Sequence, residues 1–517
     1  MKRLVSLILA LCLMSIPLLS LAEDTAVAQT TPAVHRQDYD HSAVDTSKPY
    51  NVLMYLVGNK LPGTDAVVEE INKILKVEYN TTLQSEYLPW SDYQTKYPLI
   101  LAGGEACDLI YAASWCYLYT EAAKGSYFEM DEDFIKTNMP MTWANQKTES
   151  WGQTTINGAC VGIPCNMMVP NYKYVAIRQD LAEKYGITSL NSWDDFMNYM
   201  ITIAEKETPV SGIYALDAAQ NNIELWRSYS QITNQMGVYS ENFLTPFQGV
   251  GVKPAAEDFQ YAYLTDAFRS FATDMKKLAD AGCWSRSALS NTSVGNYESF
   301  GNLTGATEVW NGTIFNYMHQ AEANEGVRCE AYDLSPESVV FAEEYNNSVM
   351  CISANSENPE RAALVADLLG YDYELNLLAL LGIENVNWED RGNGYYFSDT
   401  TQEAYPACSN AMGWWCKKDY KIGVYDDARR EAFDNNFKSR MVSNPCTTFV
   451  FDESPVKAYM AAVTAVKDEY FGALTLGLVD DVDANFAEME ARLETAGLPV
   501  VMAEFTKQYN AWLESSK

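Results

Sequence analysis

The chain has 517 residues, 48% of them apolar, and a formal net charge of −33. This length and apolar content are typical of a large globular protein with two or three domains. The negative charge excludes nucleic acid as a general partner, because phosphate binding requires a positive surface.

The N-terminus has the pattern of a secretory signal peptide over residues 1–22. Lys2 and Arg3 precede an apolar run shorter than the ~20 residues that a membrane-spanning helix needs. Residues 23–47 are polar without periodicity, so we expect a disordered tether there. Cys12 lies inside the apolar run rather than after it, which argues against a lipid anchor. The sequence therefore predicts an exported protein, extracellular or associated with the cell surface.

Strands and helices alternate after the tether. Residues 52–57 form a continuous apolar run, typical of a buried parallel strand, and residues 65–79 place their apolar side chains on one helical stripe. Residues 82–88 and 108–112 are predicted as two further strands. This order predicts an α/β fold, in which ligands bind at the carboxyl ends of the strands.

Helix boundaries can be predicted further along the chain. Ser192 and Asp195 have the spacing of a capping box before an apolar stripe. Asn358 and Pro359 suit the start of a helix that we expect to stop at Gly370. Two amphipathic helices end the sequence. The pattern as a whole predicts two α/β lobes with helical additions.

Neither the cysteines nor the acidic loops have the spacing of a metal site. Of the eleven cysteines, all but Cys12 lie beyond the signal peptide, and either disulfides or buried free thiols suit an exported chain. Zinc is disfavoured, because no two close Cys-x-x-Cys pairs occur. Residues 481–485 are similar to a calcium loop, but Phe486 takes the position of the required glycine. We expect neither a metal nor a cofactor.

Several segments carry a family resemblance. They are LAGGEACDLIYAASW (101–115), GACVGIPCN (158–166), AIRQDLAEKYGI (176–187) and NSWDDFMNYMITIAEKE (191–207). Their order resembles that of the extracellular solute-binding proteins of family 1, which serve ABC-type sugar importers. LGIENVNWED (381–390) and AGLPVVMAEFTKQYNAW (496–512) look like a Gram-positive lipoprotein subgroup with its own C-terminal region.

The resemblance implies a two-lobe periplasmic-binding-protein-like fold with a hinge that closes on a sugar. Residues 48–175 would form mainly lobe 1 and residues 176–345 mainly lobe 2. Residues 346–517 would return to lobe 1 and add the C-terminal helical region. The expected partners of this monomer are a carbohydrate-like ligand and the membrane permease of an ABC importer.

Carbohydrate binding needs flat apolar faces and planar hydrogen-bonding groups, and the chain has 12 Trp and 34 Tyr. Trp115 is the first candidate, because it follows the predicted strand 108–112. The other ligand-binding candidates are Asn59, Lys60, Asn166, Trp310, Glu384, Trp388, Trp414 and Trp415. For each tryptophan core packing is the alternative, and for Asn166 it is simple turn chemistry.

The sequence thus predicts a substrate-binding component of an ABC importer with no catalytic residue. A carboxylate-dependent glycosidase is one alternative, because 69 Asp and Glu make some pair at glycosidase separation almost unavoidable. A peptide-binding surface protein is another, since peptides also use aromatic pockets. The acidic surface disfavours anionic ligands at long range, although Lys60 or Arg227 could hold a uronate.

Overall fold

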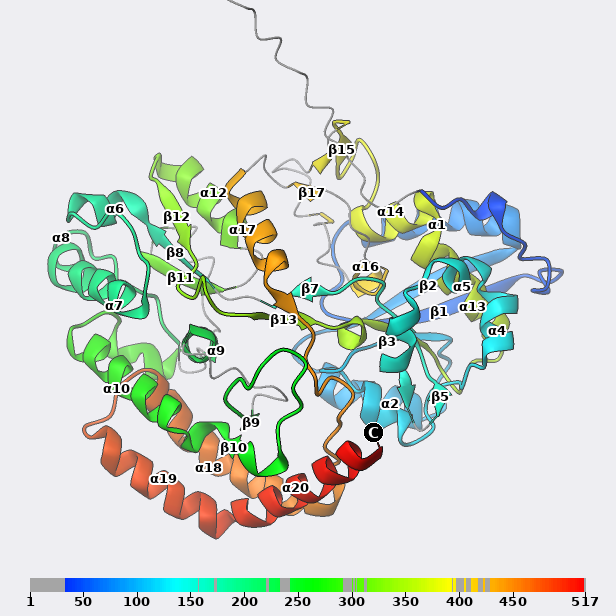
Figure 1. The fold of residues 1–517 in the computed structure, drawn as a ribbon. Coiled ribbons are helices and arrows are strands. Elements are labelled where there is room, and N and C mark those ends of the chain that lie inside the picture. Colours follow the sequence, from blue (N-terminus) through cyan, green and yellow to red (C-terminus); the bar gives the residue numbers. More distant parts are fainter. Residues whose placement is uncertain are drawn as a thin grey trace, which may run out of the picture.

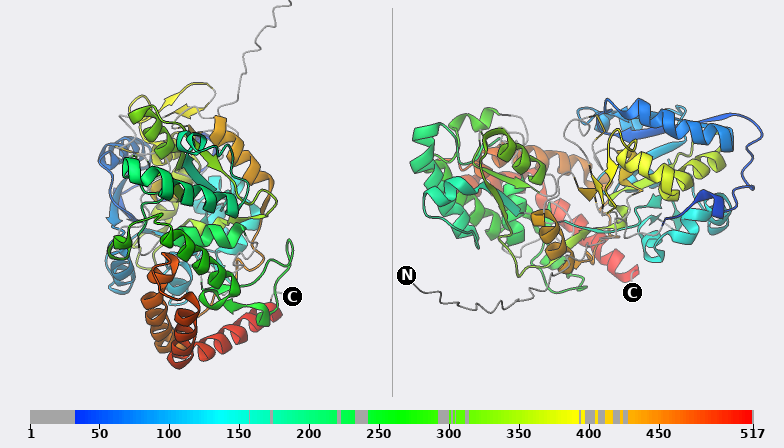
Figure 2. Two further views of the ribbon diagram at one scale, coloured as in Figure 1. Left: turned by 90° about the vertical axis from the view of Figure 1, so that its left-hand side faces the viewer. Right: turned by 90° about the horizontal axis from the view of Figure 1, so that it is seen from above.

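The computed structural model describes residues 33–156, 158–171, 174–219, 223–232, 242–291, 300, 303, 305–310, 314–392, 394–396, 404–405, 411–416, 422–423 and 428–515. These residues form two lobes with a narrow middle between them (Figures 1 and 2). The predicted signal peptide lies outside the described residues. The predicted α/β fold with two lobes is confirmed.

Lobe 1 is built on a five-stranded sheet of order β2-β1-β3-β14-β6, in which β1, β2 and β3 run parallel and β14 and β6 are each antiparallel to a neighbour. The strands are β1 (Tyr50–Val57), β2 (Thr81–Leu88), β3 (Leu109–Ala112), β6 (Ile163–Pro164) and β14 (Val349–Ile352). The strands predicted at 52–57, 82–88 and 108–112 are therefore confirmed to within two residues.

Helices and short hairpins complete lobe 1. The helices are α1 (Thr64–Tyr79), α2 (Tyr93–Ala102), α3 (Leu118–Ala122), α4 (Glu132–Asn138), α5 (Pro140–Asn145), α13 (Pro359–Tyr371), α14 (Tyr373–Leu381) and α16 (Ala411–Trp414). The small strands are β4 (Thr155–Ile156), β5 (Ala159–Cys160), β15 (Glu389–Asp390), β16 (Tyr395–Tyr396) and β17 (Ile422–Gly423).

Lobe 2 surrounds an antiparallel sheet of order β11-β8-β12. Its strands are β8 (Tyr174–Arg178), β9 (Phe243–Leu244), β10 (Gln260–Tyr261), β11 (Thr307–Trp310) and β12 (Cys329–Tyr332). Its helices are α6 (Gln179–Lys184), α7 (Trp193–Thr202), α8 (Thr208–Ser211), α9 (Ile223–Ile232), α10 (Asp266–Asp280), α12 (Ile314–Glu325), α17 (Ala428–Ser439), α18 (Lys457–Thr475), α19 (Val482–Ala496) and α20 (Leu498–Ser515).

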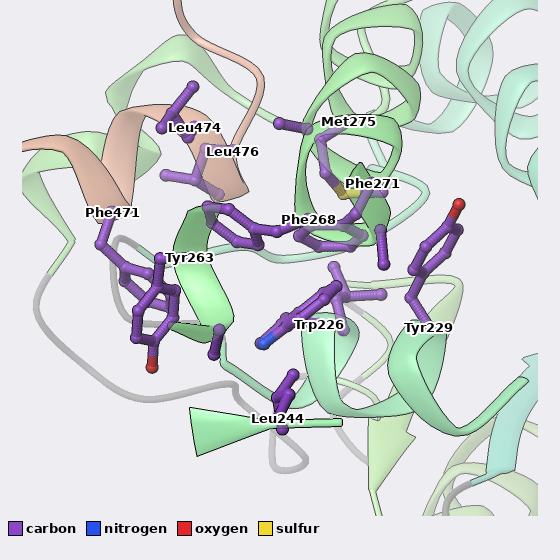
Figure 3. Packing of buried hydrophobic residues seen from close by; sticks show 14 of the residues in the cluster. Trp226, Tyr229, Leu244, Tyr263, Phe268, Phe271, Met275, Phe471, Leu474 and Leu476 are labelled. Atoms are coloured by element: carbon purple, nitrogen blue, oxygen red, sulfur yellow. The ribbon is translucent and has the colours of Figure 1, made fainter. Parts of the chain in front are cut away.

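The C-terminal helices share the core of lobe 2. Phe471 of α18 packs parallel to Phe268 of α10, with ring centroids 6.4 Å apart, and Trp226 of α9 meets the same Phe268 edge-on at 5.0 Å (Figure 3). Burying such aromatic side chains contributes on the order of 2–3 kcal/mol each. The C-terminal helical region is thus part of lobe 2 rather than a separate unit.

Three short strands form a sheet where the chain crosses between the lobes, which we call the crossing sheet. β13 (Val340–Glu343) pairs with β7 (Val169–Pro170) on one side and with β18 (Met441–Val442) on the other. Figure 1 shows this sheet in the middle of the molecule, between the two lobes. The chain crosses from lobe 1 to lobe 2 through β7 and returns through β13, which we call the second crossing. From β13 it passes through a short 3-10 helix (Tyr345–Asn347) into β14 of the lobe 1 sheet.

Two helix boundaries test the capping predictions. Ser192 Oγ accepts a hydrogen bond from the Asp195 N–H at the start of α7, as predicted. The Asp195 carboxylate accepts from the Asn191 N–H rather than from that of Ser192, so only half of the predicted box forms. Helix α13 begins at Pro359 after its cap Asn358, also as predicted. The predicted stop at Gly370 is wrong, because the helix continues to Tyr371. Gly370 lies against the ring of Trp415, where a Cβ atom would come within 3.2 Å, so packing rather than helix termination accounts for this glycine.

The disorder predicted for residues 23–47 is wrong for residues 33–47, which lie along lobe 1. Arg36 is 8% exposed, and its guanidinium bonds to Glu78, Asp372 and Glu374. His41 Nε2 lies 2.8 Å from the buried Asp367 carboxylate. We call residues 33–47 the N-terminal strap. Two of its polar side chains, Arg36 and His41, are thus buried against carboxylates of distant residues, so the strap is ordered despite its polar composition.

The described cysteines are free thiols, and no disulfide joins them. Burial raises the pKa values of the Cys107 and Cys116 thiols to about 12, which keeps both protonated. Within the described ranges, no group of three or more His, Cys, Asp or Glu side chains could hold a metal ion. None of the described helices is both long and apolar enough to cross a membrane.

Candidate ligand-binding site

The carboxyl ends of β1, β2 and β3 meet at one edge of the lobe 1 sheet because the three strands are parallel. Gly58 and Asn59 follow β1, Trp90 follows β2 by two residues, and Trp115 follows β3. Figure 1 shows β3 and α16 on the side of lobe 1 that faces β7 and β13. The strand ends therefore bring aromatic side chains next to the crossing sheet.

Three tryptophans form a continuous surface at this edge, which we call the aromatic platform: Trp90, Trp115 and Trp414. The ring centroids of Trp90 and Trp414 are 6.0 Å apart with planes 25° apart, and those of Trp90 and Trp115 are 6.1 Å apart. Trp90 is 47% exposed and Trp115 44% exposed. A group of exposed apolar rings is typical of a surface that binds a ligand or a partner.

Backbone geometry positions the platform. Gly58 has a φ of 109°, and a Cβ atom there would lie 3.5 Å from the Trp90 ring. Tyr117 has a φ of 55°, in the left-handed region, and stacks on Tyr97 with ring centroids 4.8 Å apart. A tyrosine with positive φ is strained, and such strain clusters at functional sites.

Buried groups beneath the platform tie it to the second crossing. Trp115 Nε1 donates to the carbonyl of Asn347, at 3.0 Å. Tyr111 lies under both Trp115 and Trp414, and its hydroxyl is 3.0 Å from Ser348 Oγ. Burial raises the Tyr111 pKa well above its ordinary value, so this hydroxyl stays protonated.

A small hollow adjoins the platform. It has a volume of about 10 Å³, enough for about one water-sized group. Its lining is Cys165, Met167, Val169, Glu343, Glu344, Asn347 and Ser348. Glu344 is 6% exposed and accepts hydrogen bonds from Gln153 Nε2 and the Asn444 N–H, at 3.0 and 2.8 Å. Burial raises the pKa of its carboxyl.

Four of the predicted site residues lie at this edge of lobe 1. Trp115 and Trp414 are members of the platform. Asn59 and Lys60 are exposed beside it, and Lys60 Nζ forms an ion pair with Asp65 at 2.7 Å. Trp310 ends strand β11 in lobe 2, where its backbone pairs with that of Tyr174.

The other predicted residues are not brought to the platform. Trp388 is 6% exposed and donates its indole N–H to the Gly382 carbonyl, while Trp415 is 2% exposed against Gly370. Both are core residues, so neither presents a ring face to a ligand. Glu384 is exposed on the turn that leads to Trp388. Asn166 lines a separate small gap with Trp415.

Trp90 was not among the residues predicted to bind the ligand. The signal was present, because Trp90 follows a predicted strand as Trp115 does. Asn347 and Glu344 carried no such signal. Their place beside the platform depends on the pairing of β14 with β3, two strands more than 200 residues apart in the chain.

Comparisons with known proteins bear on this arrangement. The family model described as "Bacterial extracellular solute-binding protein" matches residues 58–315, and a domain of unknown function, DUF3502, matches residues 445–514. A Streptococcus pneumoniae protein named "Carbohydrate ABC transporter substrate-binding protein" is 22% identical over 488 residues, which cover 92% of this chain and 93% of the relative.

Solved structures have the same fold. The N-glycan transport solute binding protein NgtS of Streptococcus pneumoniae has a TM-score of 0.71 and 19% identity, covering 91% of this chain and all of its own. The alginate-binding protein AlgQ2 has a TM-score of 0.63 and 15% identity, with the same coverage of both chains. At these identities the likeness shows a shared two-lobe fold.

Proposed function

This chain belongs to the bacterial extracellular solute-binding proteins, and we propose that it is the substrate-binding component of an ABC-type importer for an oligosaccharide or a sugar derivative. The aromatic platform is the observation that carries the proposal. Pyranose rings present flat C–H faces that stack on indole rings, and two of the three platform tryptophans are close to half exposed.

Polar groups suited to sugar hydroxyls lie around the stacking surface. Asn59 is exposed at the end of β1, and Asn347 lines the hollow. Planar amides can donate to one hydroxyl while they accept from another. A ligand that touches both the platform and lobe 2 would stabilise closure about the crossing sheet, because closure requires contacts that form only in the closed state.

The proposal also covers partners and place of action. The chain would act outside the cytoplasm as a monomer, deliver its ligand to a membrane permease, and bind no nucleic acid. It would bind the sugar and release it unchanged. Oligosaccharide binding also agrees with the names of the relatives, which include a carbohydrate transporter component and an N-glycan transport protein.

The test is a thermal-shift screen of the exported chain against neutral oligosaccharides, uronides, amino sugars and short peptides, with chromatography of the recovered ligand. A ligand at a hundredfold excess over its Kd adds about 2.7 kcal/mol to the free energy of unfolding. A saccharide that raises Tm and is recovered intact supports the proposal. Cleaved product would instead indicate a glycosidase, and a response to peptides alone would indicate a peptide-binding protein.

A further inference from the structure

Residues that line the hollow contact two tryptophans of the platform. Cys165 Sγ lies 3.8 Å from the Trp414 carbonyl, and Trp115 Nε1 donates to the Asn347 carbonyl. Cys165 and Asn347 both line the hollow. The hollow thus lies next to Trp115 and Trp414, within reach of a substituent of a sugar ring stacked on the platform.

The charge in the hollow is negative. Two carboxylates, Glu343 and Glu344, line it together with uncharged side chains. Both carboxylate oxygens of Glu344 accept from neutral donors, an amide side chain and a backbone N–H. Burial raises the pKa of the Glu344 carboxyl, although the bonds from Gln153 and Asn444 favour its charged form. A second negative charge beside it would be repelled.

Cations near the platform already face carboxylates. Lys60 Nζ lies 2.7 Å from Asp65, and Lys96 Nζ lies 2.5 Å from Asp92, two residues beyond Trp90. Arg227, the other cation considered for a uronate, is exposed on α9 of lobe 2. In the described part of the site, Lys60 and Lys96 are thus paired with carboxylates, and two further carboxylates line the hollow.

We infer that the site takes uncharged saccharides and rejects uronates, with Glu343 and Glu344 setting this preference. The inference rests on the proposed function and narrows its substrate class. A hydroxyl has the size of the hollow and can donate to the oxygens of Glu343 or Asn347, whereas a uronate carboxylate has no proton to donate. The overall charge of −33 adds a long-range repulsion of the same sign.

Four tetrasaccharides of equal length test this inference. Calorimetric Kd values would be compared for mannotetraose and chitotetraose against tetramannuronate and tetragalacturonate, at about 0.01 M and about 1 M NaCl. We expect at least one uncharged sugar to bind about tenfold or more tighter than either uronate at both salt concentrations. High salt screens the net charge of the protein but acts less on the partly enclosed hollow, so a preference that vanishes at high salt would overturn the role of the hollow.

The variant Glu343→Gln assigns the preference to the site. It removes one charge and leaves Glu344, whose oxygens hold the crossing sheet, in place. Glu490→Gln on the exposed surface of α19 is the control, since it makes the same change in net charge. We expect the uronate-to-neutral Kd ratio to fall in Glu343→Gln only. An unchanged ratio, or a uronate preference in the unaltered protein, overturns the inference but not the importer proposal. Binding of neither class overturns both.

Discussion

The indole N–H of Trp115 donates to the backbone carbonyl of Asn347 at 3.0 Å, although the two residues lie 232 positions apart. Trp115 belongs to a loop of lobe 1, whereas Asn347 lies on the chain segment that arrives from lobe 2. The hydrogen bond fixes the edge of the ring while 44% of the side chain stays exposed. A ligand stacked on Trp115 would therefore contact a ring that is hydrogen-bonded to the second crossing.

Replacing Trp115 by Phe separates these two roles. Phe retains an aromatic face but has no N–H, so we expect the free energy of unfolding to fall by about 1 kcal/mol. Ligand affinity should fall less in Trp115→Phe than in Trp115→Ala, where loss of the stacking face is expected to cost about tenfold, or ~1.4 kcal/mol. Calorimetry measures both the ligand affinity, by titration with a saccharide from the screen, and the stability, by thermal scans. Equal affinity in all three proteins would remove Trp115 from the site.

Trp90 offers a second test, with a control of the same residue type. Its ring stacks on Trp414, and we expect Trp90→Ala to weaken saccharide binding by about tenfold. Trp143 is 40% exposed elsewhere on lobe 1, where Lys136 Nζ lies over its ring at 4.6 Å. Trp143→Ala should leave the affinity unchanged. Similar losses in both variants would mean that the effect comes from general destabilisation of lobe 1.

Local sequence patterns predicted the lobe 1 sheet well. The apolar run of β1 and the helical stripe of α1 are local signals, and each depends on a few neighbouring residues. Trp115 was placed correctly at the end of β3 by the same reasoning. Local patterns thus predict which side chains share a face of a helix or strand and where a strand ends.

Features that depend on distant partners could not be predicted in this way. Trp415 was predicted to bind the ligand, yet its ring packs on Gly370, in a helix that precedes it by more than 40 residues. The strap looked disordered because the partners of Arg36, above all Asp372, lie far along the chain. Burial of a polar segment by remote ion pairs leaves no trace in the segment itself.

The packing of the C-terminal helices on lobe 2 can be tested at Gly477. This residue follows α18 with a φ of 61°, and a Cβ atom there would lie 2.2 Å from the Met275 carbonyl oxygen of α10. We expect Gly477→Ala to cost more than about 4 kcal/mol in urea unfolding, because two backbones would have to separate. Gly186 has a φ of 80° with open space around it, so Gly186→Ala should show only the strain of positive φ, about 1–2 kcal/mol. Equal costs would contradict the close approach of α18 to α10.

The strap predicts a pH dependence of stability. In Arg36→Met the carboxylate of Asp372, which is 1% exposed, loses its cation, and we expect a loss of about 3–5 kcal/mol at neutral pH. The hydrogen bond from Arg36 lowers the pKa of Glu78 below its ordinary value. A lowered carboxyl pKa in the folded state gives stability that is present above the ordinary pKa and is lost as the pH falls through the lowered one.

The difference in stability between the unaltered protein and Arg36→Met should therefore be largest near neutral pH and shrink as Glu78 takes up a proton. Urea unfolding in steps from about pH 7 to about pH 3 measures it. Arg269 is the control, because its exposed contact with Asp483 spans 3.5 Å, and Arg269→Met should cost under about 1 kcal/mol with little change over this range. A difference that grows toward low pH would mean that Arg36 does not stabilise ionised carboxylates, and the strap would then be held by its remaining contacts, such as that between His41 and Asp367.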